Sequence, residues 1–242
     1  MMELRGRVAL ITGASKGLGL EIARLYARKG ARLILTARGG DLLASAAREL
    51  DGLTDVLALG GDVADADHAE RLVREGLARF GTIDVLVNNA SALGPSPLPE
   101  LKDYPTDTLA DVFAVNVVAP LRLTQLVLPG MVAAGAGVIL NVTSDAGVVA
   151  YPTWGGYGAT KAALEHLSKV LAAELEGTNV RVYVVDPGDM NTEMHRQAEP
   201  GVDLSHLPGP ELSGPAFAHL AEAETAPFGR FEAQMMATAV PA

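Results

Sequence analysis

The stretch VALITGASKGLG, residues 8–19, runs from an apolar segment through a glycine-rich turn into a helical segment. Its glycines permit a tight turn and let backbone N–H groups approach a pyrophosphate, and the dipole at a helix start favours that anion. The spacing alone is weak evidence, because 26 glycines in 242 residues produce it by chance about 0.3 times per chain. A glycine-rich turn without a ligand is the alternative, and the strand–turn–helix context favours a dinucleotide site. The cofactor contacts predicted here are Gly13, Ser15, Lys16, Gly17, Leu18 and Gly19.

Outward from this turn, short apolar runs alternate with helical segments. The runs are nearly continuous, which is typical of strands covered by helices on both faces. The expected strands are Val8–Thr12, Leu33–Thr36, Val56–Leu59, Val85–Asn88, Val138–Val142 and Val180–Val185, and the expected helices are Leu18–Arg28, Leu42–Leu50, Asp65–Phe80, Thr106–Ala134 and Gly158–Leu175. The alternation predicts an α/β fold, a Rossmann-type doubly wound parallel sheet with helices on both faces, in one domain over residues 1–242.

Two segments interrupt this rhythm. Ser91–Pro105 contains four prolines beyond the end of an expected strand. Asp186–Pro215 is long and rich in proline and glycine, as expected of a functional lid or of disorder, and a substrate lid at about 188–215 is favoured. After it, Ala216–Ala223 is expected to be helical and Arg230–Met236 to form a last strand.

Composition excludes several classes of function. The net charge of −10 argues against binding nucleic acid or an anionic membrane, because both need clustered Lys and Arg. The chain has no cysteine, which excludes disulfides and thiolate metal sites. The first residues do not resemble a secretory signal, and no apolar stretch is expected to reach the roughly 18–20 residues that span a bilayer. We expect a soluble cytoplasmic protein. The histidines show no metal-ligand spacing with nearby acids, so no catalytic metal is predicted.

The end of the second expected strand bears on cofactor choice. NAD-preferring folds place an acid near this point to bind the ribose hydroxyl, whereas this chain has Ala37 and then Arg38. A guanidinium can hold a 2′-phosphate with two hydrogen bonds, and Lys16 adds positive charge in the turn. Ordinary surface charges are the alternative, and Asp41 is the nearest acid that would favour NAD. NADP(H) is therefore predicted over NAD(H).

Tyr157 and Lys161 are four residues apart in a helix-compatible stretch, so their side chains share a face. A nearby ammonium favours the phenolate form of a tyrosine, which can then exchange a proton with an alcohol. Chance produces such a pair about 0.1 times in this chain, and a surface helical pair is the alternative. Ser144 ends the preceding strand, so it is expected at the same edge of the sheet, where its hydroxyl could polarise a carbonyl. Asn116 lies in a long helix, where an amide is more often structural.

Together these residues resemble the short-chain dehydrogenase/reductase family. The matching motifs are Thr12 to Gly19, Asp62-Val63, Asn88-Asn89-Ala90, Asn116, Ser144 thirteen residues before Tyr157, Tyr157 with Lys161, and Pro187-Gly188 with Thr192. All occur in order over residues 8–192. Two features depart from the family pattern: Ser91 replaces the glycine of N-N-A-G, and the C-terminal tail lacks the usual ending.

The resemblance implies a role for each matching residue. Tyr157 would be the general acid/base, Lys161 would lower its pKa and bind the nicotinamide ribose, Ser144 would orient the substrate oxygen, and Asn116 would hold a water. The implied cofactor contacts are Asp62, Val63, Asn89, Ala90, Pro187, Gly188 and Thr192, together with Tyr157 and Lys161. A homodimer or homotetramer is implied as well.

The substrate is expected to be a small carbonyl or alcohol compound. Candidate wall residues are Leu93, Trp154, Met190 and Met194, which indicate an apolar pocket without choosing the compound. An NADP(H)-dependent oxidoreductase is the leading interpretation. An epimerase or dehydratase that works by transient oxidation, and a non-catalytic dinucleotide sensor, remain as alternatives because one fold hosts several chemistries.

Overall fold

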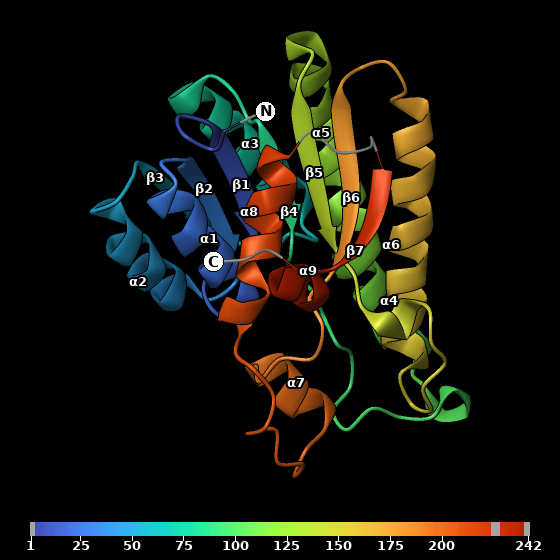
Figure 1. Cartoon of the computed structure of the whole chain (residues 1–242). Helices are drawn as coiled ribbons and strands as arrows, with labels where there is room; N and C mark the ends of the chain where they lie inside the picture. The colour runs from blue at the N-terminus through green and yellow to red at the C-terminus, as the bar shows by residue number, and fades with distance from the viewer. Residues whose placement is uncertain (1–2, 224–227, 240–242) are drawn as a thin grey trace.

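A computed structural model describes residues 3–223 and 228–239. Among them is a seven-stranded sheet in the order β3-β2-β1-β4-β5-β6-β7, in which every pairing is parallel. The strands are β1 Val8–Thr12, β2 Arg32–Ala37, β3 Val56–Gly60, β4 Val85–Asn88, β5 Gly137–Val142, β6 Val180–Asp186 and β7 Phe228–Glu232. All point the same way in Figure 1. The Rossmann-type prediction is confirmed.

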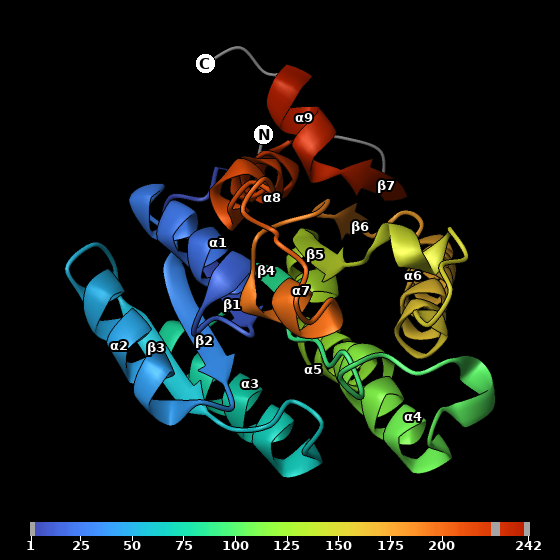
Figure 2. The same ribbon diagram turned by 90° about the horizontal axis from the view of Figure 1, so that it is seen from below.

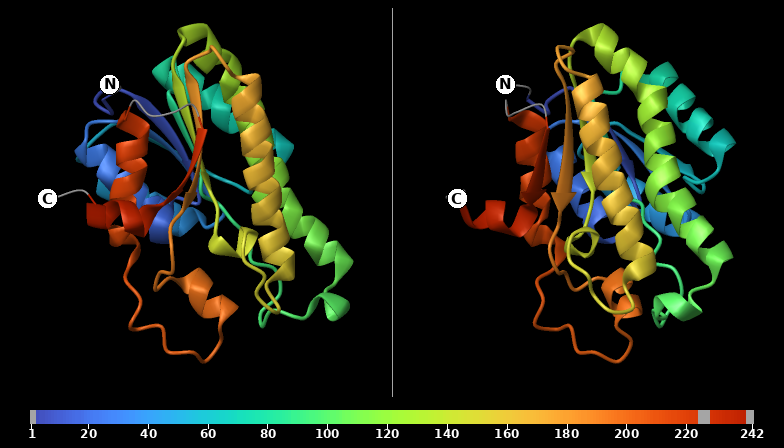
Figure 3. Two further views of the ribbon diagram at one scale, coloured as in Figure 1. Left: turned by 45° about the vertical axis from the view of Figure 1, so that its right-hand side comes forward. Right: turned by 90° about the vertical axis from the view of Figure 1, so that its right-hand side faces the viewer.

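Helices cover both faces of the sheet (Figures 2 and 3). On one face lie α1 Gly17–Arg28, α2 Gly40–Asp51 and α8 Gly214–Glu222, and on the other lie α3 Ala66–Phe80, α5 Ala119–Ala134 and α6 Gly155–Glu174. Alternate residues of the central strands enter the two apolar cores, which is why these strands read as continuous apolar runs. The strand order reverses between β1 and β4, and ligands in such sheets bind at the carboxyl ends of the strands beside that point.

The expected helix Thr106–Ala134 consists of α4 Thr106–Phe113, a π-helical turn Ala114–Val118, and α5. By length and composition alone it could cross a membrane, with a mean hydropathy of 1.5 over its most apolar window. The expectation that no apolar stretch reaches that length was therefore wrong. Leu123, Val127 and Met131 of this helix are buried in the core beneath the sheet, and a core helix passes the same test.

The structure also revises the last third of the chain. The expected lid contains the short helix α7 Glu193–Ala198, which lies beyond the carboxyl edge of the sheet (Figure 1). The expected last strand, Arg230–Met236, was wrong in its bounds. Phe228–Glu232 pairs with Val182–Asp186 as β7, and the following residues form helix α9, Ala233–Ala239. Alanine, glutamine and methionine favour a helix, which explains the change at Ala233.

Candidate active site

A cleft of about 1620 Å³ opens at the carboxyl edge of the sheet. All but two of the predicted site residues line it. The lining residues are Gly13, Ser15, Lys16, Gly17, Leu18, Arg38, Asp62, Val63, Asn89, Ala90, Leu93, Ser144, Trp154, Tyr157, Lys161, Pro187, Gly188, Met190, Thr192 and Met194. Gly19 and Asn116 lie behind this wall. The cleft therefore joins the glycine-rich turn, the Tyr–Lys pair and the expected lid in one space.

The turn between β1 and α1 is held by close contacts that only glycine allows. Gly13 has φ of +66°, and a Cβ on Gly19 would lie 2.4 Å from the Gly13 oxygen. Asn89 fastens the turn, because its Nδ2 donates a hydrogen bond to Thr12 O at 2.8 Å. The start of α1 has no side-chain cap and no acid in its first turn. A turn of this shape with open backbone N–H groups fits a dinucleotide pyrophosphate.

The two basic residues expected at the phosphates have different surroundings. Lys16 Nζ lies 2.5 Å from Glu193 Oε2, so an exposed ion pair joins the turn to α7. Arg38 follows β2 at the wall of the cleft, and no acidic side chain pairs with it in the part of the chain that the structure describes. The ion pair Lys16–Glu193 was not predicted, because the two residues are 177 positions apart.

Asn116 is buried in the π-helical turn and uses its whole amide. Its Nδ2 donates to Thr160 Oγ1 at 2.9 Å and to Ala92 O at 2.8 Å, and its Oδ1 accepts from Ala92 N at 2.7 Å. Ser91 also donates to that oxygen, at 3.1 Å. Asn116 therefore fixes the segment after β4 against α6. The water-holding role implied by the family resemblance stays a prediction.

Tyr157 and Lys161 lie one turn apart on α6, both buried beside the cleft. Lys161 Nζ lies 5.2 Å from the centre of the Tyr157 ring and donates a hydrogen bond to Val142 O at 2.9 Å. The ring of Trp154 meets that of Tyr157 edge to face, with 5.9 Å between centroids. The predicted pair is thus brought to one place, and its ammonium is tied to the end of β5, two residues before Ser144.

Burial controls the protonation of both groups. It raises the pKa of Tyr157 far above the ordinary value of 10, although the hydrogen bond between Tyr157 and Ser91 works in the opposite direction. Burial also lowers the pKa of Lys161 from 10.5 to about 8, against the attraction of Asp186. Desolvation disfavours the charged form of each group, and the lowering of the Tyr157 pKa by Lys161 stays a prediction. A neutral phenol is the form that donates a proton to a carbonyl oxygen.

The hydroxyl of Ser144 lies in a small cluster of polar groups that the sequence did not predict. Its hydroxyl donates to Asp145 Oδ1 at 3.0 Å and accepts from Ala146 N at 3.2 Å. Tyr151 donates from its hydroxyl to Asp145 Oδ2 at 2.7 Å. Asp145 and Tyr151 both line the cleft. Asp145 could have been predicted as a site residue because it directly follows Ser144 in the sequence, whereas no local pattern indicated Tyr151.

The residues expected to form the substrate wall come together around Tyr157. Leu93, Trp154 and Met194 belong to one apolar cluster with Tyr157, while Met190 packs against the neighbouring core. Met194 comes from α7, so the expected lid contributes to this wall. Within residues 3–223 and 228–239, no three His, Asp or Glu side chains are arranged to hold a metal ion.

Comparison with known proteins agrees with this geometry. The short chain dehydrogenase family model matches residues 7–203. The 3-oxoacyl-[acyl-carrier-protein] reductase FabG of Thermotoga maritima is 36% identical over 196 residues, which cover 80% of this chain and 78% of that protein. D-threitol dehydrogenase of Mycolicibacterium smegmatis is 38% identical over 202 residues, covering 82% and 76%. A short chain dehydrogenase from Shigella flexneri 2a, solved in complex with NADP, is 30% identical with a TM-score of 0.88, covering 96% of this chain and 98% of that one.

The chain belongs to the short-chain dehydrogenase/reductase family. It is an oxidoreductase that acts on alcohol or carbonyl groups.

Proposed function

We propose that this protein is an NADP(H)-dependent carbonyl reductase or alcohol dehydrogenase in which Tyr157 is the general acid/base. The observation that carries the proposal is the meeting of Ser144, Tyr157 and Lys161 in one cleft with the glycine-rich turn. The proposal treats the chain as one domain with residues 188–215 as its substrate lid.

The cofactor is NADP(H). Arg38, at the end of β2, is placed to hold a 2′-phosphate, and the NADP-bound relative from Shigella flexneri shares the fold closely. Gly13, Ser15 and Gly17 would bind the pyrophosphate through backbone N–H groups. Asp62 and Val63 would border the adenine, and the segment from Pro187 to Thr192 would border the nicotinamide. When bound, the reduced cofactor supplies the hydride.

The remaining chemistry belongs to the side chains. Ser144 would hold the substrate oxygen by a hydrogen bond and so fix the carbonyl carbon. Tyr157, kept as a neutral phenol by burial, which raises its pKa, donates its proton to that oxygen as the carbon is reduced. In the reverse direction it takes the proton back. Lys161 would bind the ribose, and its ammonium would stabilise the phenolate that forms.

The substrate site combines apolar and polar walls. Leu93, Trp154 and Met194 exclude water around Tyr157, whereas Asp145 and Tyr151 offer hydrogen bonds beside Ser144. Ketones, aldehydes or secondary alcohols with an apolar substituent on one side and a hydroxyl on the other match such walls. The named relatives reduce a 3-oxoacyl group or oxidise a sugar alcohol, by their names.

The proposed assembly is a homodimer or a homotetramer built from such dimers. Support comes from α5, α6 and the turn before α5, which expose apolar side chains beside one shallow groove; these are Val118, Leu121, Leu167 and Val170. Burial of such a patch stabilises an interface by roughly 25 cal/mol per Å². The proposed location is the cytoplasm, with which the absence of cysteines is compatible.

The test is a panel of carbonyl compounds assayed with NADPH and NADH by loss of absorbance at 340 nm. We expect turnover of at least one ketone or aldehyde, with a lower KM for NADPH than for NADH. If neither cofactor is oxidised with any compound, although NADPH binds, the enzyme proposal fails and a dinucleotide sensor is the better description.

A further inference from the structure

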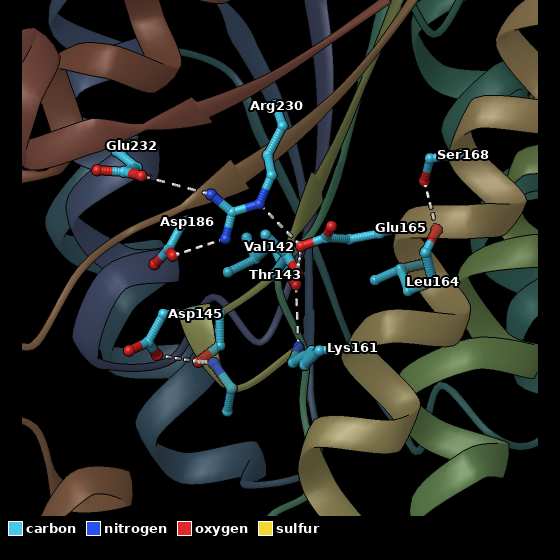
Figure 4. Close-up of polar contacts among 12 residues, drawn as sticks. Val142, Thr143, Asp145, Lys161, Leu164, Glu165, Ser168, Asp186, Arg230 and Glu232 are labelled. Atoms are coloured by element: carbon cyan, nitrogen blue, oxygen red, sulfur yellow. Dashed lines mark hydrogen bonds and ion pairs between the residues drawn. The ribbon is translucent and has the colours of Figure 1, made fainter. Parts of the chain in front are cut away.

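Arg230, on the C-terminal strand β7, joins three parts of the molecule behind the cleft (Figure 4). Its Nε lies 3.1 Å from Glu165 Oε1 on α6, and its Nη2 lies 3.0 Å from Asp186 Oδ2 at the end of β6. A third, more exposed partner is Glu232, 3.6 Å from Nη1. The planar guanidinium presents several donors in a fixed fork, which suits one arginine to two carboxylates at once.

Each buried partner of Arg230 is connected to a residue of the proposed active site. Glu165 is one helical turn beyond Lys161 on α6, and its Oε1 also accepts a hydrogen bond from Thr143 Oγ1 at 2.6 Å. Thr143 directly precedes Ser144. Two hydrogen bonds through Glu165 therefore connect the guanidinium of Arg230 to Thr143, and Glu165 itself lies one helical turn from Lys161.

Asp186 connects Arg230 to the segment that is expected to border the nicotinamide. Its Oδ1 accepts a hydrogen bond from Gly188 N at 2.9 Å, which fixes the turn that begins the expected nicotinamide segment. Gly188 has φ of +73°, a left-handed conformation that needs glycine. Arg230 thus fastens the carboxylate around which this turn folds.

Burial makes Arg230 important to both carboxylates. The side chains of Glu165 and Asp186 are each only 8% exposed, whereas that of Arg230 is 25% exposed. Removing the cation would leave two carboxylates in a poorly solvated place, and breaking such a pair is far more disruptive than breaking a surface one. Arg230 lies outside residues 7–203, which the family model matches.

We propose that Arg230 is a positioning residue for the reaction: from the C-terminal strand it holds the α6 helix and the Asp186–Gly188 turn together, so that Lys161 and Ser144 keep their places in the cleft. This inference rests on the proposed roles of Ser144 and Lys161. Displacement of a reacting group by about 1 Å can cost about a hundredfold in rate. The expected signature is therefore a loss in kcat that exceeds any loss in binding.

The experiment compares Arg230→Met, Arg230→Lys and Arg24→Met with the wild type. Arg24 is the matched control, because it makes a two-point ion pair with Glu49 on the outer surface, at 2.6 and 2.8 Å. For each variant, titration with NADPH gives its Kd and the concentration of binding sites. The best compound of the carbonyl panel then gives KM and kcat per binding site, which removes any effect of unfolded protein.

Arg230→Met is expected to lower kcat at least tenfold while substrate KM and NADPH Kd change less than threefold. The kcat of Arg230→Lys should be at least threefold higher than that of Arg230→Met, because an ammonium can still pair with one carboxylate. Arg24→Met should keep kcat within twofold. The inference is overturned if Arg230→Met keeps kcat within twofold of the wild type. It is also overturned if the kcat of Arg230→Lys is no higher than that of Arg230→Met, or if Arg24→Met loses as much kcat as Arg230→Met.

Where Arg230→Met yields no folded protein, Glu165→Leu carries the test from the other side. Leucine fills similar space but neither pairs with Arg230 nor accepts from Thr143, and the same limits on kcat, KM and Kd decide the result. A wild-type protein that is inactive on the whole panel defeats the proposed function and this inference with it. An active wild type with an equally active Arg230→Met defeats the inference alone.

Discussion

Lys161 should weaken the fold at neutral pH, and its replacement tests this directly. The side chain is 2% exposed, and burial lowers its pKa from 10.5 to about 8. Between these two pH values the unfolded chain binds more protons than the folded one, so stability rises with pH across this window. Below pH 8 the whole penalty applies. A lowering of this size corresponds to roughly 3 kcal/mol.

Lys161→Met removes the charge but keeps a long apolar side chain. The variant also loses the hydrogen bond from Nζ to Val142 O, and a charged donor contributes about 1.5–3 kcal/mol. Near pH 7 the two effects partly cancel, so the variant should be about 0–2 kcal/mol more stable than the wild type. At pH 10 the linkage relation leaves roughly 1 kcal/mol of the penalty, so the advantage of the variant should fall by roughly 2 kcal/mol.

The assay is urea unfolding followed by far-ultraviolet circular dichroism at pH 7, 8, 9 and 10. Wild type and variant are compared at one protein concentration, because assembly changes apparent stability. Groups that do not interact with Lys161 titrate alike in both proteins, so their contributions cancel in the difference. A difference in unfolding free energy that stays constant from pH 7 to pH 10 would refute the reasoning, since a buried lysine with a lowered pKa must produce a slope.

Three further predictions concern the cofactor and the assembly. Arg38→Asp should raise the KM for NADPH relative to that for NADH by roughly 10- to 100-fold, because a charge-assisted contact becomes a repulsion; an unchanged ratio of the two KM values would show that Arg38 does not bind the phosphate. Glu193→Gln should lower the NADPH Kd by roughly two- to fivefold, because Lys16 loses a competing exposed partner, and titration that finds weaker binding would contradict this. Leu167→Glu should halve the mass measured by light scattering, or reduce a tetramer to smaller species, whereas Leu53→Glu, on a surface away from α6, should not; an unchanged mass for Leu167→Glu would count against the proposed interface.

The sheet was predictable because its strands are buried on both faces. Each of the first six strands lies within one residue of its expected bounds at either end. Continuous apolar runs are a local signal, and short turns separate them from the helices. The seventh strand was displaced because β7 is an edge strand with partly exposed residues, and its place is set by pairing with β6 rather than by its own pattern. Helix α7 was not predicted because it has only six residues, too few to show a helical pattern.

The candidate site divides in the same way. Tyr157 with Lys161, Ser144 and the glycine turn are recognisable because their spacing is local, within one helix, strand end or turn. The two buried partners of Arg230 lie 44 and 65 residues from it in sequence, so only the fold reveals them. The protonation states also needed the structure, because the spacing gives the neighbour of Tyr157 but not how deeply each group is buried.

The central claim is that the hydroxyl of Tyr157 moves the proton that accompanies hydride transfer. The most direct measurement is kcat of Tyr157→Phe at saturating NADPH and substrate, beside NADPH titration and the control Tyr26→Phe. The control variant removes a buried hydrogen bond from the Tyr26 hydroxyl to Phe217 O, far from the cleft. We predict that Tyr157→Phe binds NADPH normally and loses roughly 10²- to 10⁴-fold in kcat, while Tyr26→Phe stays active. Turnover by Tyr157→Phe within tenfold of the wild type would contradict the account.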